Sequence, residues 1–177
     1  MNEGRPIITD PSNHQGDGGD EGAAAGTEPG EHPPGEGGGQ HGSGDAEELG
    51  QRAGTHLAIA CDITNTEKRN EAVDAAIKQF GKIDILVNNA GVALLNKADV
   101  VSEKEWDTTM AVNLKAPFFL AQAVAKHMSQ KGSGQIINLA SQASVIALDR
   151  HVAYCASKAA VVSMTEVLAI EWAAAGI

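Results

Sequence analysis

The chain has 177 residues, which suits one domain, and its formal net charge of −10 arises entirely within the first 50. Residues 1–50 hold 14 of the 20 glycines, 5 of the 6 prolines and 11 acidic side chains against one arginine. The remaining 127 residues carry 12 acidic and 12 basic side chains, so no basic patch points to nucleic acid or an anionic membrane.

Residues 1–50 are predicted to form a disordered tail rich in glycine, proline and acidic residues. Met1–Gly44 has almost no large apolar side chains and cannot offset the roughly 1–2 kcal/mol that ordering each residue costs. No basic start precedes an apolar run, and no apolar stretch reaches the roughly 18–20 residues of a membrane span. Cys61 and Cys155 lack metal-ligand spacing. We therefore expect a cytoplasmic protein with reduced thiols, no metal and no membrane partner.

Strands and helices alternate along residues 51–177. Short apolar runs predict buried strands at His56–Ala60, Lys82–Asn88 and Gln135–Leu139. Capping boxes predict helices that begin at Thr64-x-x-Glu67 and Ser102-x-x-Glu105. The alternation predicts an α/β protein with a parallel sheet.

The later helices carry further signals. Gly81 is expected to end the first helix, and Pro117 to bend the second, which runs towards Met128. A last helix from about Val152 to Ala174 is apolar all round, which predicts burial on more than one side.

Polar residues follow the predicted strands, where ligands bind in open parallel sheets. They are Asp62, Asn88–Gly91 and Ser141. Tyr154 and Lys158 stand four residues apart, which places them on one helix face. An ammonium near a phenol favours the phenolate and lowers a pKa that starts near 10, so such a tyrosine can exchange a proton with an alcohol.

Each signal alone has a plainer interpretation. The tyrosine and lysine could share a solvated face, Ser141 could bond its own backbone, and Asn113 could be a surface residue. The Asn-Asn-Ala-Gly run could be a turn. Their order and spacing together favour a functional site.

Taken together, Asn88-Asn89-Ala90-Gly91, Asn113, Ser141 and Tyr154-Cys155-Ala156-Ser157-Lys158 resemble the short-chain dehydrogenase/reductase family. The 13-residue step from Ser141 to Tyr154 matches the usual interval of the family. The resemblance covers about residues 55–177. Within it, Leu139–Ala160 looks most like the polyol and sugar-alcohol dehydrogenases.

The resemblance implies a partial Rossmann-like, doubly wound parallel sheet over residues 51–177, without the first two and the last strands. Gly38, Gly42 and Gly44 match the spacing of the family's nucleotide loop, but no strand precedes them. The family normally continues beyond Ile177. In the family's strand order the first two strands would lie between those ending at Asp62 and Asn88. We expect open sheet edges, a marginal or aggregating chain and weak dinucleotide affinity.

The implied reaction is hydride transfer between NAD or NADP and a small alcohol or carbonyl compound. Tyr154 is the expected general acid/base, and Ser141 hydrogen-bonds the same substrate oxygen. Lys158 lowers the pKa of Tyr154 and holds the nicotinamide ribose. Asn113 holds a water that relays protons from Lys158.

The resemblance also implies cofactor contacts and alternatives. Asp62 accepts from the adenine amino group, Ile63 lies beside the ring, and Asn88, Ala90 and Gly91 line the adenosine ribose, together with Tyr154 and Lys158 at the nicotinamide end. NAD is favoured over NADP. Family members are usually dimers or tetramers. A 3-oxoacyl-thioester reductase is the rival enzyme, and a non-catalytic fragment associated with a full-length relative is the alternative outside enzymes.

Overall fold

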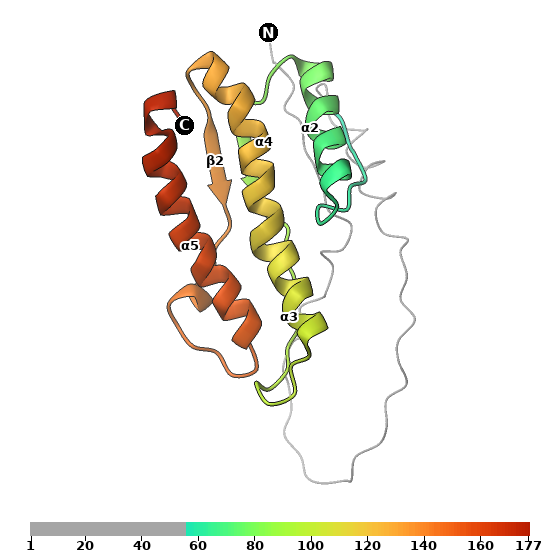
Figure 1. Ribbon diagram of the computed structural model, residues 1–177, viewed down its shortest axis with the longest axis vertical. Coiled ribbons are helices and arrows are strands. Elements are labelled where there is room, and N and C mark those ends of the chain that lie inside the picture. The colour runs from blue at the N-terminus through green and yellow to red at the C-terminus, as the bar shows by residue number, and fades with distance from the viewer. Residues whose placement is uncertain (1–55) are drawn as a thin grey trace.

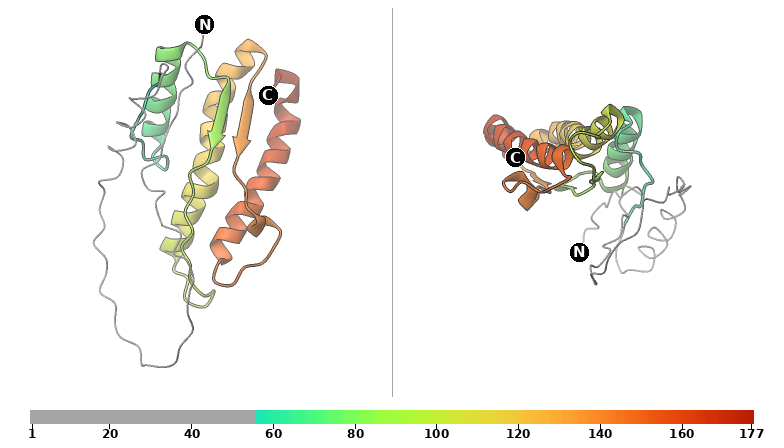
Figure 2. Two further views of the ribbon diagram at one scale, coloured as in Figure 1. Left: turned by 180° about the vertical axis from the view of Figure 1, so that it is seen from behind. Right: turned by 90° about the horizontal axis from the view of Figure 1, so that it is seen from below.

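The structure is a computed structural model that describes residues 56–177; the predicted tail and the glycines at 38, 42 and 44 lie outside the described residues. Its helices lie in one layer against a two-stranded parallel sheet, as Figures 1 and 2 show from three sides. This confirms the predicted α/β class. The helices are α2 (Thr66–Phe80), α3 (Glu103–Met110), α4 (Ala116–Lys131) and α5 (Val152–Trp172). The strands are β1 (Ile85–Asn88) and β2 (Gln135–Asn138), and short turns η1 (Ala111–Lys115), η2 (Gln142–Ser144) and η3 (Ala173–Ala175) complete the order.

The two strands pair in a register that sorts their side chains onto two faces. Leu86 faces the helices and is 8% exposed, whereas Val87, beside Ile137 on the opposite face, is 52% exposed. We call the exposed side chains the outer sheet face: Ile85, Val87, Ile137 and Leu139. Alternate residues of a strand point to opposite faces of the sheet. Because the described helices all lie on one side of the sheet, every second strand residue is exposed on the other side.

The strand predicted at His56–Ala60 is wrong for the described residues. Residues 56–59 are irregular, and Ala60 is a single bridge residue. The run therefore contributes a single bridge residue and not a continuous strand. The segment just after it, with Cys61 and Ile63, nevertheless packs into the hydrophobic core.

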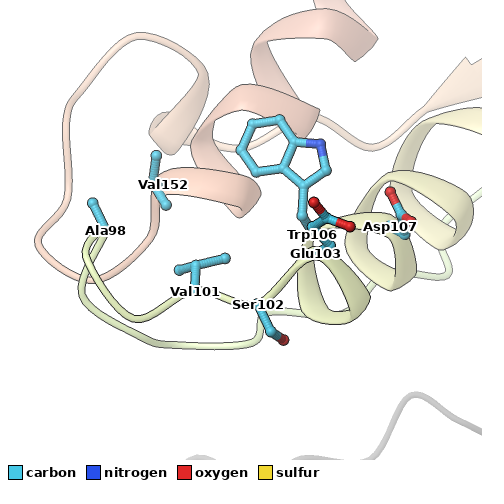
Figure 3. A pocket seen from close by; sticks show the side chains of 7 residues that line it. All are labelled: Ala98, Val101, Ser102, Glu103, Trp106, Asp107 and Val152. Atoms are coloured by element: carbon cyan, nitrogen blue, oxygen red, sulfur yellow. The ribbon is translucent and has the colours of Figure 1, made fainter.

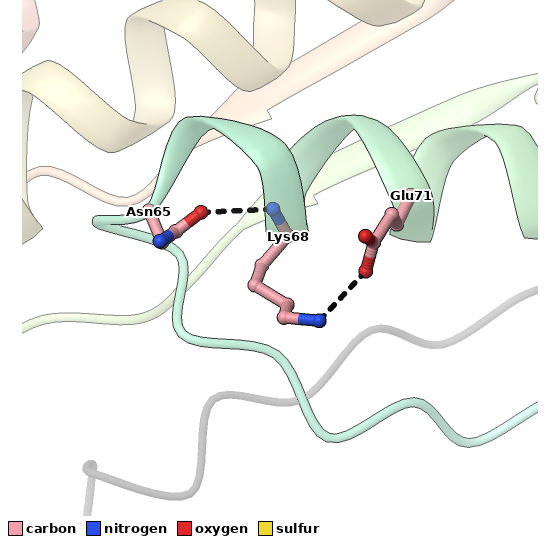
Figure 4. A network of polar contacts seen from close by, with 3 residues as sticks. All are labelled: Asn65, Lys68 and Glu71. Atoms are coloured by element: carbon pink, nitrogen blue, oxygen red, sulfur yellow. Dashed lines mark hydrogen bonds and ion pairs between the residues drawn. The ribbon is translucent and has the colours of Figure 1, made fainter.

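Helix α2 begins one step later than the predicted capping box. Both the N–H and the hydroxyl of Thr64 donate to Asp62 Oδ1, at 2.9 and 2.7 Å, so Asn65 caps the helix and accepts from the Lys68 N–H at 3.0 Å. Lys68 also pairs with Glu71 at 2.9 Å, an exposed ion pair that solvent screens (Figure 4). Gly81 ends α2 with φ 73°, as predicted.

The second predicted helix forms as two α-helices, α3 and α4, joined by the short π-helix η1. Its capping box is confirmed: Ser102 accepts from the Glu105 N–H at 3.2 Å, and Glu105 accepts in return. Pro117 lies in the first turn of α4, immediately after η1. Proline has no N–H to donate to the preceding turn, so a continuous α-helix is interrupted there. The interruption is the π-helix η1.

Helix α5 buries one side only. Ser157 and Lys158 face inward, whereas Val167 is 48% and Ile170 80% exposed, so the burial predicted on more than one side is absent among the described residues. Residues Val152–Ala175 are long and apolar enough to cross a membrane, which we did not expect from the sequence. Length and composition alone carry that result, and the core helix of an α/β protein passes the same test.

Candidate functional site

The four predicted catalytic residues come from three segments beyond the carboxyl ends of β1 and β2. Asn113 lies in η1, Ser141 follows β2, and Tyr154 and Lys158 occupy the first turns of α5. Both η1 and η2 pack against α5. The fold therefore brings these segments together at the edge where parallel sheets bind ligands.

Lys158 is buried and close to Tyr154. The residue is 5% exposed, its Nζ donates to the Leu139 carbonyl at 2.7 Å, and it stands 5.8 Å from the centroid of the Tyr154 ring. Burial lowers the pKa of the Lys158 amine below its ordinary 10.5, because a low-dielectric surrounding disfavours the charged form. One of its three N–H donors is engaged by Leu139, and this leaves two for a ligand.

The side chain of Asn113 is 1% exposed, and both its oxygen and its nitrogen are hydrogen-bonded. Its Oδ1 accepts from the Val92 N–H at 2.8 Å, and its Nδ2 donates to the Val92 carbonyl at 2.9 Å and to Ser157 Oγ at 3.0 Å. The amide thus fastens the chain that follows β1 to η1 and to α5. Both N–H donors of the side chain are engaged, so a relay water at Asn113 would have to donate to the second lone pair of Oδ1 or use a main-chain group.

Gly91 lies at the same place. A Cβ at Gly91 would stand 3.4 Å from Asn113 Oδ1 and 3.5 Å from Lys158 Nζ. Ala90, beside it, packs against the hydrophobic core. Glycine therefore leaves open the space next to the Lys158 ammonium.

Ser141 caps the short turn η2. Its Oγ accepts from the Ala143 N–H at 3.1 Å, and its own N–H donates to Ser144 Oγ at 3.4 Å. The backbone bond predicted as the plainer interpretation is therefore present. It uses the oxygen only as an acceptor, so the hydroxyl proton stays available for a substrate oxygen.

Asp62 and Ile63 differ in what they offer a ligand. Asp62 is exposed, and hydrogen bonds from the Thr64 hydroxyl and N–H lower the pKa of its carboxyl group below 3.8. Both of those bonds are made to Oδ1. Ile63 is 4% exposed and belongs to the core, and its carbonyl accepts from buried Arg69 at 2.6 Å. Its side chain presents little surface to an adenine ring.

Asn88 is used inside the fold. Its Nδ2 donates to Asn138 Oδ1 at 2.8 Å and to the Pro117 carbonyl at 3.2 Å, and Asn138 in turn donates to Thr165 at 2.9 Å. This network ties β1, β2, α4 and α5 together. The Asn88 side chain therefore stabilises the sheet and has no hydrogen bond to the residues around Lys158 among those described.

Sequence reasoning missed Ser157 and the Asn138–Thr165 bond. Ser157 was visible within the Tyr-Cys-Ala-Ser-Lys run, but nothing in the spacing showed that it faces η1. Asn138 stood at a strand end like Asn88, which was a usable signal for a cross-strand amide pair.

A shallow pocket of about 330 Å³ lies between the start of α3 and the start of α5 (Figure 3). Trp106 and Val152 line it from the two helices, with the carboxylates of Glu103 and Asp107 nearby. None of the four predicted catalytic residues lines this pocket. The predicted catalytic site is thus separate from this pocket.

The lowered pKa of Lys158 predicts how stability depends on pH. The folded state holds the Lys158 proton less tightly than the unfolded state, so stability should rise as pH increases through the window between the lowered pKa and 10.5. Lys158→Met should remove this rise, whereas the same change at exposed Lys126 should keep it. Urea unfolding from neutral to alkaline pH measures both, and equal slopes for the two variants would contradict the prediction.

Comparison with known proteins identifies the family. The chain matches the short chain dehydrogenase family over residues 41–177, beginning earlier than the 55 expected from the sequence. The chain belongs to this family. It is 49% identical to D-threitol dehydrogenase of Mycolicibacterium smegmatis over 75% of this chain and 51% of the relative. It is 58% identical to NAD-dependent glycerol dehydrogenase of Listeria innocua over 66% and 46%.

A solved structure shares the fold. The gluconate 5-dehydrogenase of Burkholderia cenocepacia, in complex with NADP and tartrate, superposes with a TM-score of 0.67 at 35% identity, covering 75% of this chain and 51% of that one. The chain therefore spans about half the length of the relatives it matches. It is an oxidoreductase-family chain related to polyol dehydrogenases.

Proposed function

We propose that residues 51–177 carry the proton-transfer part of a site that interconverts a polyol and its carbonyl compound, with NAD or NADP as the hydride carrier. The observation that carries the proposal is the buried Lys158 amine, 5.8 Å from the Tyr154 ring and next to Gly91. A buried amine beside a phenol at a strand-end edge is the arrangement that proton transfer to an alcohol needs.

The residues present fit a dinucleotide. Two N–H donors of Lys158 remain for a pair of ribose hydroxyls, and Gly91 keeps the adjoining space open. The exposed carboxylate of Asp62 suits the adenine amino group as an acceptor. When bound, the dinucleotide supplies hydride transfer, which no side chain provides.

The side chains divide the remaining work. Tyr154 takes the proton of the substrate hydroxyl, and the Ser141 hydroxyl donates to the same oxygen and stabilises its developing charge. The Lys158 ammonium favours the phenolate of Tyr154. Asn113 fixes the arrangement through Val92 and Ser157, so its contribution is positional.

The substrate class rests on the relatives. The matches to threitol and glycerol dehydrogenases at 49% and 58% identity favour a polyol over a 3-oxoacyl thioester, and the second relative favours NAD. A second function is supported by a different observation. The bare outer sheet face and the half-length match favour a non-catalytic chain that associates with a full-length relative.

A substrate panel tests the proposal. The purified 177-residue chain would be assayed with NAD and with NADP against glycerol, threitol, gluconate and the monohydric 2-propanol. We expect dinucleotide reduction that is fastest with a polyol and with NAD, at high dinucleotide concentration because the sequence predicts weak affinity. Absence of turnover with every pair would refute the catalytic proposal and favour the non-catalytic one.

A further inference from the structure

Ser157 lies on α5 between Tyr154 and Lys158 and is completely buried against η1. Its Oγ is 2.8 Å from the Tyr154 carbonyl and 3.0 Å from Asn113 Nδ2. A hydroxyl has one proton to donate. Because the Tyr154 carbonyl can only accept, that proton goes to Tyr154, and the oxygen must accept from Asn113.

The hydrogen bond from Asn113 to Ser157 is not one that a serine inside a helix normally makes. A serine inside a helix commonly bonds the carbonyl three or four residues before it, as Ser157 does with Tyr154. The bond from Asn113 instead joins two separate elements. It continues a chain of contacts from the Val92 main chain through the Asn113 amide to the helical turn that carries Tyr154.

We propose that Ser157 is a positioning residue for the proton-transfer site. Its hydroxyl holds the Asn113 amide at a fixed distance from the α5 turn that presents Tyr154 and Lys158. Without the hydroxyl, this buried N–H of Asn113 loses its acceptor, and η1 loses the 3.0 Å hydrogen bond that joins it to Ser157. The inference rests on the proposed function, since Ser157 acts on the reaction only through these neighbours.

Kinetics of three variants test the role in turnover. Ser157→Ala should lower kcat about tenfold or more, because small displacements of reacting groups are costly, while KM for NAD stays within about twofold. Ser157→Thr keeps the hydroxyl and should restore most of kcat. Ser163→Ala, the same change at an exposed position of α5, should behave like the parent. An unchanged kcat in Ser157→Ala, or no recovery in a folded Ser157→Thr, would overturn the proposal.

A second measurement does not depend on activity. Both Nδ2 protons of Asn113 are hydrogen-bonded and buried, so their exchange with solvent, followed by nuclear magnetic resonance, should be slow in the parent. Ser157→Ala should exchange them about tenfold faster or more, with Ser163→Ala unchanged. If Ser157→Ala fails to fold, Ser157→Cys, which keeps the size and weakens the acceptor, takes its place.

The two measurements separate two failures. A parent without turnover refutes the proposed function, and the exchange rates then decide the Ser157 link alone. Faster exchange in the variant supports the link, and unchanged exchange overturns it.

Discussion

Asn113→Leu should lower the free energy of unfolding by about 2–5 kcal/mol, because it strands several buried polar groups at once. Leucine has nearly the shape of asparagine but can neither accept from the Val92 N–H nor donate to the Val92 carbonyl and Ser157. Each unsatisfied group costs about 1–3 kcal/mol, against a total stability of about 5–15 kcal/mol for a typical domain.

Urea unfolding followed by circular dichroism measures this change. Asn70→Leu is the matched control, because Asn70 is exposed on α2 and an identical substitution there removes no buried bond. We expect the control to stay within about 0.5 kcal/mol of the parent. A loss below about 1 kcal/mol in Asn113→Leu would show that the amide does not fasten η1 to α5.

The outer sheet face should make the chain self-associate as its concentration rises. Val87 and Ile137 lie side by side on this face at 52% and 47% exposure, and no described helix covers them. Complete burial of a fully exposed side chain of this kind is worth about 1.5–3 kcal/mol, and these two, already about half covered, would each gain about half of that. The double variant Val87→Thr with Ile137→Thr should therefore weaken association about tenfold or more.

Sedimentation over a range of concentrations measures the association. Helix α5 supplies the control surface, because Val167 and Ile170 are also exposed. The pair Val167→Thr with Ile170→Thr should leave association unchanged. If the α5 double variant weakens association and the Val87/Ile137 double variant does not, the contact lies on α5 and the prediction is wrong.

Local signals in the sequence predicted the helices well, because caps and glycines act over a few residues. Ser102 and Glu105 formed the expected capping box, and Gly81 ended α2 in the left-handed region. The predicted cap at Thr64 failed for an equally local reason. Asp62 captured both the hydroxyl and the N–H of Thr64, and the next residue became the cap.

Features that depend on distant partners were harder to predict. The apolar run His56–Ala60 has the composition of a strand, but a strand also depends on pairing with residues distant in the sequence, and only Ala60 is a bridge residue. The apolar circumference of α5 predicted burial all round, whereas only its inner side is covered by described residues. Composition shows that a surface is apolar and does not show what packs against it.

In the candidate site, too, the local feature was predicted and the long-range feature was not. The spacing of Tyr154 and Lys158 predicted a shared helix face, and the structure places the Lys158 amine 5.8 Å from the Tyr154 ring. The part played by Asn113 was not evident, because its bonds to Val92 and Ser157 span 21 and 44 residues of sequence. The π-helix η1 that presents it interrupts a periodic pattern that predicts one helix.

The most direct test compares the parent chain with Tyr154→Phe in NAD-dependent oxidation of the best polyol. The substitution removes one hydroxyl and keeps the ring that lies near Lys158, so both proteins should unfold at the same urea concentration. We predict that kcat/KM falls by about 10²–10⁴, the usual contribution of a general acid/base. Turnover by Tyr154→Phe within about threefold of the parent would contradict proton transfer at this residue.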